Sequence, residues 1–170
     1  MALVMGRVSL TIAGTEAAED LARLWVRATA RRLGQAIPEA PEPERIVALA
    51  HRVGRSGAAA VVAMDDDVAV GCCFFERLTE PDRETIIDGA AHVSGVAVEP
   101  TRWGEGLGTA LLTFTEVEVR RRGFRLLRLH VLEGNERARA LYEYLGWSLV
   151  ATGYADPSGP QAVYDKSLTN

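Results

Sequence analysis

The chain has 170 residues, of which 48% are hydrophobic and 25% are charged, and its formal net charge is −4. This length is enough for one domain with a real core, and the composition is ordinary for a soluble globular protein. The acidic balance gives no support for nucleic-acid binding, and no apolar run reaches the ~18 residues that span a membrane. Residues 1–5 are too short and lack the positive flank of a secretion signal. We therefore expect one cytoplasmic domain over residues 1–170, without nucleic-acid or membrane partners.

The N-terminal third of the chain predicts one strand and two helices. Residues 7–13 alternate weakly, which predicts a strand. Thr15 is expected to cap a helix with apolar residues at helical spacing, and Gly34 is expected to end it. A proline-rich acidic loop follows, and then a second amphipathic segment that ends near Gly54.

Two apolar runs, at residues 58–64 and 68–78, predict a β-hairpin. Asp65–Asp67 between them favour a solvated turn, because no further ligands stand at calcium-loop spacing. Cys72 and Cys73 are neighbours, and adjacent Cα atoms ~3.8 Å apart are too close for ordinary disulfide geometry. We expect two small buried thiols in a reducing compartment.

The remaining chain alternates strands and helices after a polar loop at residues 79–89. Gly95 lies inside the next strand and predicts a bulge or a close backbone approach. The expected strands are residues 90–98, 124–131, 147–152 and 162–168, and the expected helices are residues 106–122 and 135–145. The pattern is that of a mixed α/β (α+β) fold with about seven strands and about four helices.

Three glycines, Gly104, Gly106 and Gly108, stand where a predicted strand runs into a predicted helix. Glycine lets backbone amides approach a ligand closely, and the first turn of a helix offers free N–H groups at the positive end of its dipole. This junction predicts a cradle for a diphosphate. A Rossmann fingerprint would need glycine near Thr109 and an acidic residue ~20 positions on, near Leu126, and a P-loop would need a lysine. On this segment alone, a tight turn without a ligand stays open.

A second pattern follows in Asn135, Ala138, Tyr142 and Gly146, which read Asn-x-x-Ala-x-x-x-Tyr-x-x-x-Gly. With the segment from Val98 to Thr109, this pattern resembles the GNAT superfamily of acyl-CoA-dependent N-acyltransferases. The resemblance implies a GNAT fold with splayed strands at the coenzyme site and acetyl-CoA, or another acyl-CoA, as co-substrate without a metal. It also implies a small-molecule or protein amine as acceptor, and family members are often homodimers.

The resemblance places the pantetheine arm along one strand and the diphosphate against the glycine turn. Trp103 stands where the family often has glutamine or arginine, so Arg102 is expected either to meet a phosphate or to face solvent. Asn135 is expected to contact the coenzyme or a bound water, to cap a helix, or both. The expected coenzyme contacts are Val96, Ala97, Val98, Arg102, Trp103, Gly104, Glu105, Gly106, Leu107, Gly108, Thr109, Asn135 and Tyr142.

Tyr142 matches the general-acid tyrosine of the family, and a core-packing tyrosine is the alternative. His92 is the expected base because its ordinary pKa suits proton transfer, with Asp88, Glu76 or a relayed water as alternatives. The loops at residues 34–44 and 153–160 are expected to select the acceptor. A coenzyme-binding sensor without turnover and a structural interaction domain are the rival functions.

Overall fold

A computed structural model of the chain describes residues 3–81 and 84–169. The chain divides into two compact units. The first unit extends to Glu76 and includes Gly95–Thr115, and the second contains Arg77–Ser94 and the chain from Glu116 onward. The single domain expected over residues 1–170 stays a prediction.

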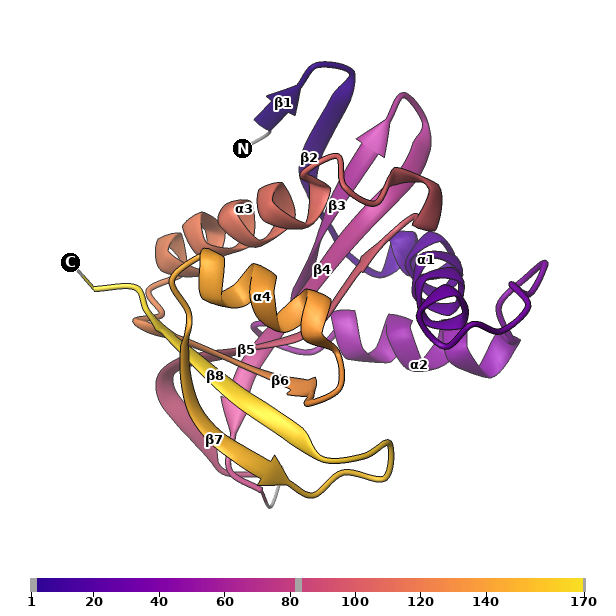
Figure 1. The fold of residues 1–170 in the computed structure, drawn as a ribbon. Helices are drawn as coiled ribbons and strands as arrows, with labels where there is room; N and C mark the ends of the chain where they lie inside the picture. The colour runs from indigo at the N-terminus through magenta and orange to yellow at the C-terminus, as the bar shows by residue number, and fades with distance from the viewer. Residues whose placement is uncertain (1–2, 82–83, 170) are drawn as a thin grey trace. The chain divides into compact units, whose positions relative to one another are not determined.

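The first unit contains a run of neighbouring antiparallel strands (Figure 1). They are β1 (Leu3–Met5), β2 (Val8–Ala13), β3 (Ala59–Asp65) and β4 (Val68–Thr79). The hairpin between β3 and β4 lies where the two apolar runs predict it, and Asp66 in its turn has a left-handed φ of 51°. Strand β1 was not predicted, because three residues are too few to show an alternation.

Two helices pack in the first unit, α1 (Ala18–Arg32) and α2 (Pro43–Val53). The prediction that Thr15 caps α1 is wrong. Thr15 begins a 3₁₀ turn, η1 (Thr15–Ala17), and this turn moves the start of α1 two residues on, with Ala17 at the N-cap. Gly54 follows the last residue of α2, as predicted.

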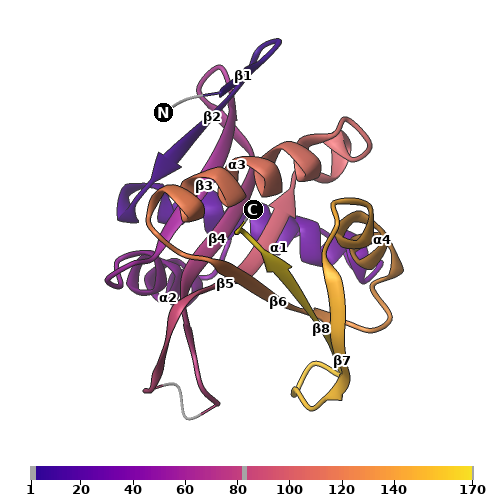
Figure 2. The same ribbon diagram turned by 90° about the vertical axis from the view of Figure 1, so that its left-hand side faces the viewer.

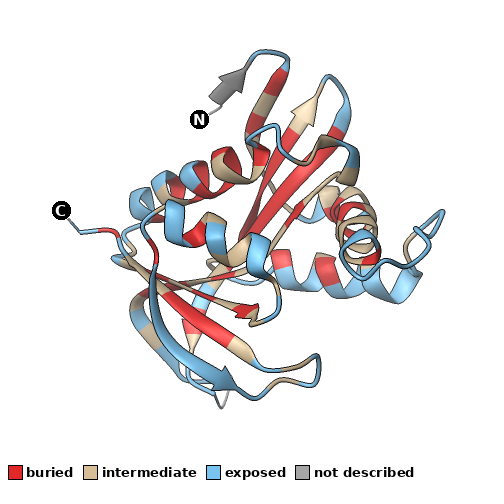
Figure 3. Cartoon of the chain, viewed as in Figure 1, coloured by how far each residue is buried: buried red, intermediate tan, exposed pale blue. Residues whose placement is uncertain are grey.

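The core of the first unit joins these helices to β3 and β4, as the red segments of Figure 3 show. Its buried members are Leu21, Ala22, Leu24, Leu49, Val53, Ala60, Val62, Ala69, Cys72, Phe74 and Ala97. Cys72 and Cys73 are both buried thiols, as expected. A Cβ built on Gly95 would lie 2.5 Å from the Trp25 ring, so Gly95 provides the close backbone approach that its position predicts.

The second unit contains a mixed set of strands. They are β5 (Ile86–Val98), β6 (Leu126–Leu132), β7 (Ser148–Tyr154) and β8 (Gln161–Ser167). Strand β5 is parallel to β6, and β8 lies between β6 and β7 and is antiparallel to both (Figure 2). Strand β5 begins at Ile86, so part of the loop expected at residues 79–89 is strand. Both β4 and β5 run through the two units.

The remaining helices are α3 (Leu107–Arg121) and α4 (Glu136–Tyr144). The described residues thus form eight strands and four α-helices, one strand more than expected. This content confirms the mixed α/β class. Within the same residues, none of the helices has the length and apolarity needed to cross a membrane.

Candidate functional site

The glycine turn connects the end of β5 to α3 within the first unit. A short 3₁₀ turn, η2 (Pro100–Arg102), follows β5, and then Gly104 and Gly106 adopt φ values of 96° and 81°. L-residues rarely adopt this left-handed region, so the backbone itself requires glycine at both positions. A Cβ built on either glycine would meet nothing within 4 Å, and the space beside the turn is therefore open.

The first amides of α3 are placed to receive an anion. The Ala110 N–H donates to the Gly106 carbonyl over 3.0 Å, which is the first helical hydrogen bond after the turn. The N–H groups at Leu107, Gly108 and Thr109 precede this bond, and helix geometry gives them no partner inside the helix. They lie at the positive end of the α3 dipole, an arrangement that suits a phosphate.

The end of β5 is fixed by three interactions within the first unit. The Trp103 indole Nε1–H donates to the Val98 carbonyl over 2.8 Å. The Glu99 N–H donates to the Val70 carbonyl of β4 over 2.9 Å. Arg27 of α1 donates two hydrogen bonds of 2.9 Å to the Glu99 carboxylate. Trp103 therefore ties the turn back to the strand that the resemblance assigns to the pantetheine arm.

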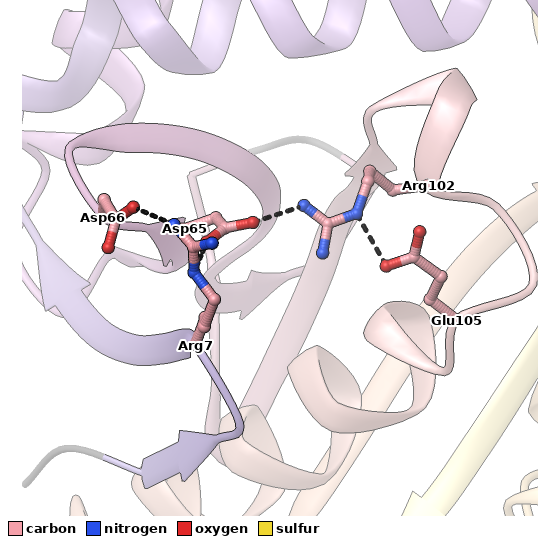
Figure 4. A network of polar contacts seen from close by, with 5 residues as sticks. All are labelled: Arg7, Asp65, Asp66, Arg102 and Glu105. Atoms are coloured by element: carbon pink, nitrogen blue, oxygen red, sulfur yellow. Dashed lines mark hydrogen bonds and ion pairs between the residues drawn. The ribbon is translucent and has the colours of Figure 1, made fainter.

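Arg102 pairs with two carboxylates (Figure 4). Its Nη1 donates to Asp65 over 2.8 Å and its Nε donates to Glu105 over 2.6 Å. These hydrogen bonds, first the one to Glu105 and then the one to Asp65, raise the pKa of Arg102. The Arg102 side chain is 25% exposed and is held on two sides by these carboxylates. The phosphate contact stays a prediction.

Asp65 also departs from expectation. The aspartate run predicted a solvated turn, yet the Asp65 side chain is 26% exposed and receives both Arg102 and Arg7, the latter as an ion pair at 3.7 Å. Arg7 also binds Asp66 in the same turn (Figure 4). The turn of the β3–β4 hairpin thus holds the loop that follows β5 through the ion pair between Asp65 and Arg102.

Tyr142 lies on α4 in the second unit and is buried. Its ring centroid is 6.0 Å from the centroids of Trp147 and Tyr164. The Tyr164 hydroxyl donates to Glu143 over 2.6 Å, so a polar contact holds the Tyr164 ring that packs against Tyr142. The Tyr142 ring therefore packs against Trp147 and Tyr164, and the role of its hydroxyl as a general acid stays a prediction.

Asn135 caps α4, because its side-chain oxygen accepts a hydrogen bond from the Ala138 N–H over 3.4 Å. This capping role is one of the two expected for Asn135. The contact of Asn135 with the coenzyme stays a prediction.

The predicted base His92 is partly buried on β5 and contacts a second histidine. Its ring meets the His130 ring edge to face at 5.4 Å, and the His130 ring meets Tyr154 in the same way at 4.7 Å. Of the alternative bases, Asp88 is exposed, and Glu76 forms ion pairs with Arg52 and Arg55. Sequence reasoning missed His130 and Tyr154. The signal for His130 is the alternation of polar residues along β6, which becomes informative only once the strand register is known.

The structure brings the predicted coenzyme loop, residues 96–109, together within the first unit. Asn135, Tyr142 and His92 belong to the second unit. In that unit Tyr142 contacts Tyr164, whereas His92 contacts His130, which stands opposite Val163. Successive residues of β8 point to opposite faces, so the tyrosine and the histidines lie on opposite faces of these strands.

Comparison with protein-family models matches residues 15–147 to the acetyltransferase (GNAT) family. A search of curated proteins finds no match. Solved structures, in contrast, resemble the chain over nearly its whole length.

Three solved structures illustrate this likeness. YncA from Salmonella typhimurium, with its cofactor acetyl-CoA, has a TM-score of 0.74 at 19% identity and covers 96% of this chain and 95% of its own. The ribosomal-protein-S18-alanine N-acetyltransferase from Escherichia coli has a TM-score of 0.69 at 21% identity, with 95% of both chains covered. The PaiA N-acetyltransferase from Thermoplasma acidophilum, in complex with coenzyme A, has a TM-score of 0.69 at 18% identity, with 93% of this chain and 98% of its own covered. At these identities the likeness establishes the fold.

Proposed function

The chain belongs to the acetyltransferase (GNAT) family, and on this premise we propose that it transfers an acetyl group from acetyl-CoA to a primary amine. Membership confirms the acyl-CoA-dependent N-acyltransferase class expected from the sequence. In our proposal the amine nitrogen attacks the thioester carbonyl directly, and residues 1–170 act as one N-acetyltransferase domain.

One observation carries the proposal: the turn at Gly104 and Gly106 opens into the N-terminus of α3. Both glycines have left-handed φ values with open space beside them, and the next three amides have no helical partner. This arrangement supports diphosphate binding by backbone alone, which does not depend on the departure at Trp103. Two relatives with the same fold contain acetyl-CoA or coenzyme A by their descriptions.

The reaction needs help with two protons. An alkyl ammonium has a pKa of ~10.4, so removing its proton at pH 7 requires about 4.6 kcal/mol. The departing thiolate is the conjugate base of a thiol with a pKa of ~8.5, and a tyrosine with a pKa of ~10 can assist its protonation. We assign that assistance to Tyr142, whose ring is held in place by Trp147 and Tyr164.

The acceptor we propose is an amine on a small molecule or a protein. The Escherichia coli relative acts, by its name, on the alanine of a ribosomal protein. In this chain Glu39, Glu42 and Glu44 are exposed on the loop before α2 and along its first turn. Their charge favours a cationic acceptor, which an ammonium is before it reacts.

Thermal melting with acetyl-CoA, followed by a thiol-release assay on a panel of amines, tests the proposal. At ~100 times the dissociation constant, binding adds about 2.7 kcal/mol, which for a chain of this size raises the Tm by roughly 5–10 °C. Thiol release with at least one amine is the second expected result. A raised Tm without thiol release on any amine would show that the protein is a coenzyme-binding sensor and not an enzyme. An unchanged Tm at millimolar acetyl-CoA would reject coenzyme binding.

A further inference from the structure

One acidic residue stands inside the glycine turn itself. Glu105 lies between Gly104 and Gly106, two positions before the first residue of α3. Two residues of chain span at most ~7 Å, so the Glu105 backbone is close to the amides at the start of α3. The Glu105 side chain is 46% exposed, and its carboxylate has the same sign of charge as a diphosphate. An unpaired Glu105 would therefore repel the anion that the turn suits.

Arg102 holds this carboxylate. The Arg102 Nε donates to Glu105 Oε2 over 2.6 Å, and Figure 4 shows the Glu105 carboxylate turned toward the guanidinium. Nη1 of the same guanidinium donates to Asp65 over 2.8 Å, which anchors Arg102 on the β3–β4 hairpin. The Glu105 N–H also donates to the Arg102 carbonyl over 3.4 Å, so the backbone between the two residues forms a tight turn. These contacts fix where the Glu105 charge lies.

The charge of Arg102 is already shared between two anions. Two arginines, Arg7 and Arg102, face three carboxylates, those of Asp65, Asp66 and Glu105, so the formal charge of this group is −1. The hydrogen bond to Glu105, and after it the one to Asp65, raises the pKa of Arg102, because both carboxylates stabilise its charged form. A direct phosphate contact would add a third anion to a guanidinium that serves two.

We propose that Arg102 is a positioning residue for acetyl-CoA, which neutralises Glu105 and keeps that carboxylate bound to itself while the backbone amides bind the diphosphate. This inference rests on the proposed function, and all of its residues belong to the first unit. Arg102 acts on the coenzyme through Glu105, and Asp65 keeps the guanidinium in place for this task. The inference therefore differs from a direct contact between Arg102 and a phosphate.

A double-mutant cycle on the binding of acetyl-CoA, measured by calorimetry, tests this role. We expect Arg102→Gln to raise the Kd about five- to twentyfold, because Glu105 is then an unpaired anion beside the diphosphate. Glu105→Gln should bind as tightly as the wild type or up to about fivefold more tightly. The double variant R102Q/E105Q should return to within about twofold of the wild-type Kd, since the repelling charge is gone. Arg32→Gln, the same change at the exposed end of α1, should leave the Kd unchanged.

The salt dependence of the Kd separates a charge effect from a change in the shape of the loop. The Debye length falls from ~10 Å at 0.1 M to ~3 Å at 1 M ionic strength, so added salt screens repulsion between an exposed carboxylate and a diphosphate. The Kd of Arg102→Gln, divided by that of the wild type, should therefore fall toward one as sodium chloride is added. A ratio that stays constant would show that the loop has changed shape and would overturn the neutralising role.

The variants distinguish this inference from its rivals. If R102Q/E105Q binds as weakly as Arg102→Gln, Arg102 contacts the coenzyme directly and the inference is wrong. If Glu105→Gln weakens binding, the carboxylate supports binding and the inference is again wrong, a result that needs no Arg102 variant to fold. In both cases the wild type still binds acetyl-CoA and releases thiol, so the proposed function stands. If the wild type shows no binding at millimolar acetyl-CoA, the proposed function fails and the inference fails with it.

Discussion

Arg102 and Asp65 are joined by a hydrogen-bonded ion pair of 2.8 Å that spans 37 positions of the sequence. This pair ties the loop after β5 to the turn of the β3–β4 hairpin. The loop that presents the α3 amides is therefore held from outside itself, and its shape depends on a carboxylate in another part of the chain.

Removing that carboxylate should weaken coenzyme binding without changing the chemistry. We expect Asp65→Asn to raise the KM for acetyl-CoA about two- to tenfold, equivalent to roughly 0.5–1.4 kcal/mol for a partly buried ion pair, with kcat nearly unchanged. Steady-state kinetics with varied acetyl-CoA measures both. Asp67→Asn, at an exposed position of the same turn, is the matched control. Equal KM values for the two variants would show that the ion pair between Asp65 and Arg102 does not support the coenzyme-binding loop.

The glycine turn permits a comparison between two positions with the same backbone strain. Gly106 and Gly123 have φ values of 81° and 88°, and a Cβ on either would meet nothing within 4 Å. Alanine at each position should therefore lower the free energy of unfolding by a similar amount, roughly 1–2 kcal/mol. Only Gly106→Ala should weaken the binding of acetyl-CoA, as measured by calorimetry. A similar loss of binding in Gly123→Ala would point to general destabilisation instead.

The hydroxyl of Tyr142 can be tested apart from its ring. Tyr142→Phe retains the contacts with Trp147 and Tyr164, so we expect a stable protein with unchanged affinity for acetyl-CoA. Its kcat should fall on the order of 10–10³-fold, because a general acid for the thiolate is lost. Tyr144→Phe, at a residue that is 81% exposed, should leave kcat unchanged. A normal rate in Tyr142→Phe would leave this tyrosine as a packing residue only.

Glu118 predicts how stability depends on pH. It is 2% exposed and accepts hydrogen bonds from Arg121 and Arg122 at 2.8 Å each. The Arg121 hydrogen bond is the main cause that lowers the pKa of Glu118 from 4.5 to about 2. Because the pKa of Glu118 is lower in the folded protein than in the unfolded chain, its carboxylate stabilises the fold fully at pH values above the unfolded pKa of 4.5. This contribution to the free energy of unfolding is lost as the pH falls from 4.5 toward 2.

Glu118→Gln should therefore reduce the free energy of unfolding by about 1–3 kcal/mol at pH 7. The difference from the wild type should narrow below pH 4 as the native carboxylate becomes protonated. Urea unfolding across this pH range measures it, with Glu39→Gln, at an exposed loop residue, as the control. A difference that stays constant with pH would exclude the ionised carboxylate as its cause.

Local signals predicted much of the fold. The end of α2 before Gly54 and the capped start of α4 at Asn135 both follow from residues within one helical turn. The fold class and the family also follow, because the glycine turn and the Asn-to-Gly pattern are each continuous in sequence. The local prediction that Thr15 caps α1 was wrong, because a 3₁₀ turn lies between Thr15 and the helix.

The features that sequence alone does not predict are long-range. The partners of Arg102 and the ring contacts of His130 join strands that are distant in sequence, and their register is set by pairing between strands. A polar residue on a strand carries no sign of which neighbour it will meet. For the same reason the sequence predicts His92 as a base from its chemistry but does not indicate that His130 lies beside it.

The contact between Trp103 and the Val98 carbonyl has a practical consequence. It places an indole, a natural fluorophore, on the segment assigned to the nucleotide, with its N–H fixed to the adjoining strand. Emission from Trp103, isolated by replacing Trp25 and Trp147 with phenylalanine, would report on this loop in solution without any added label.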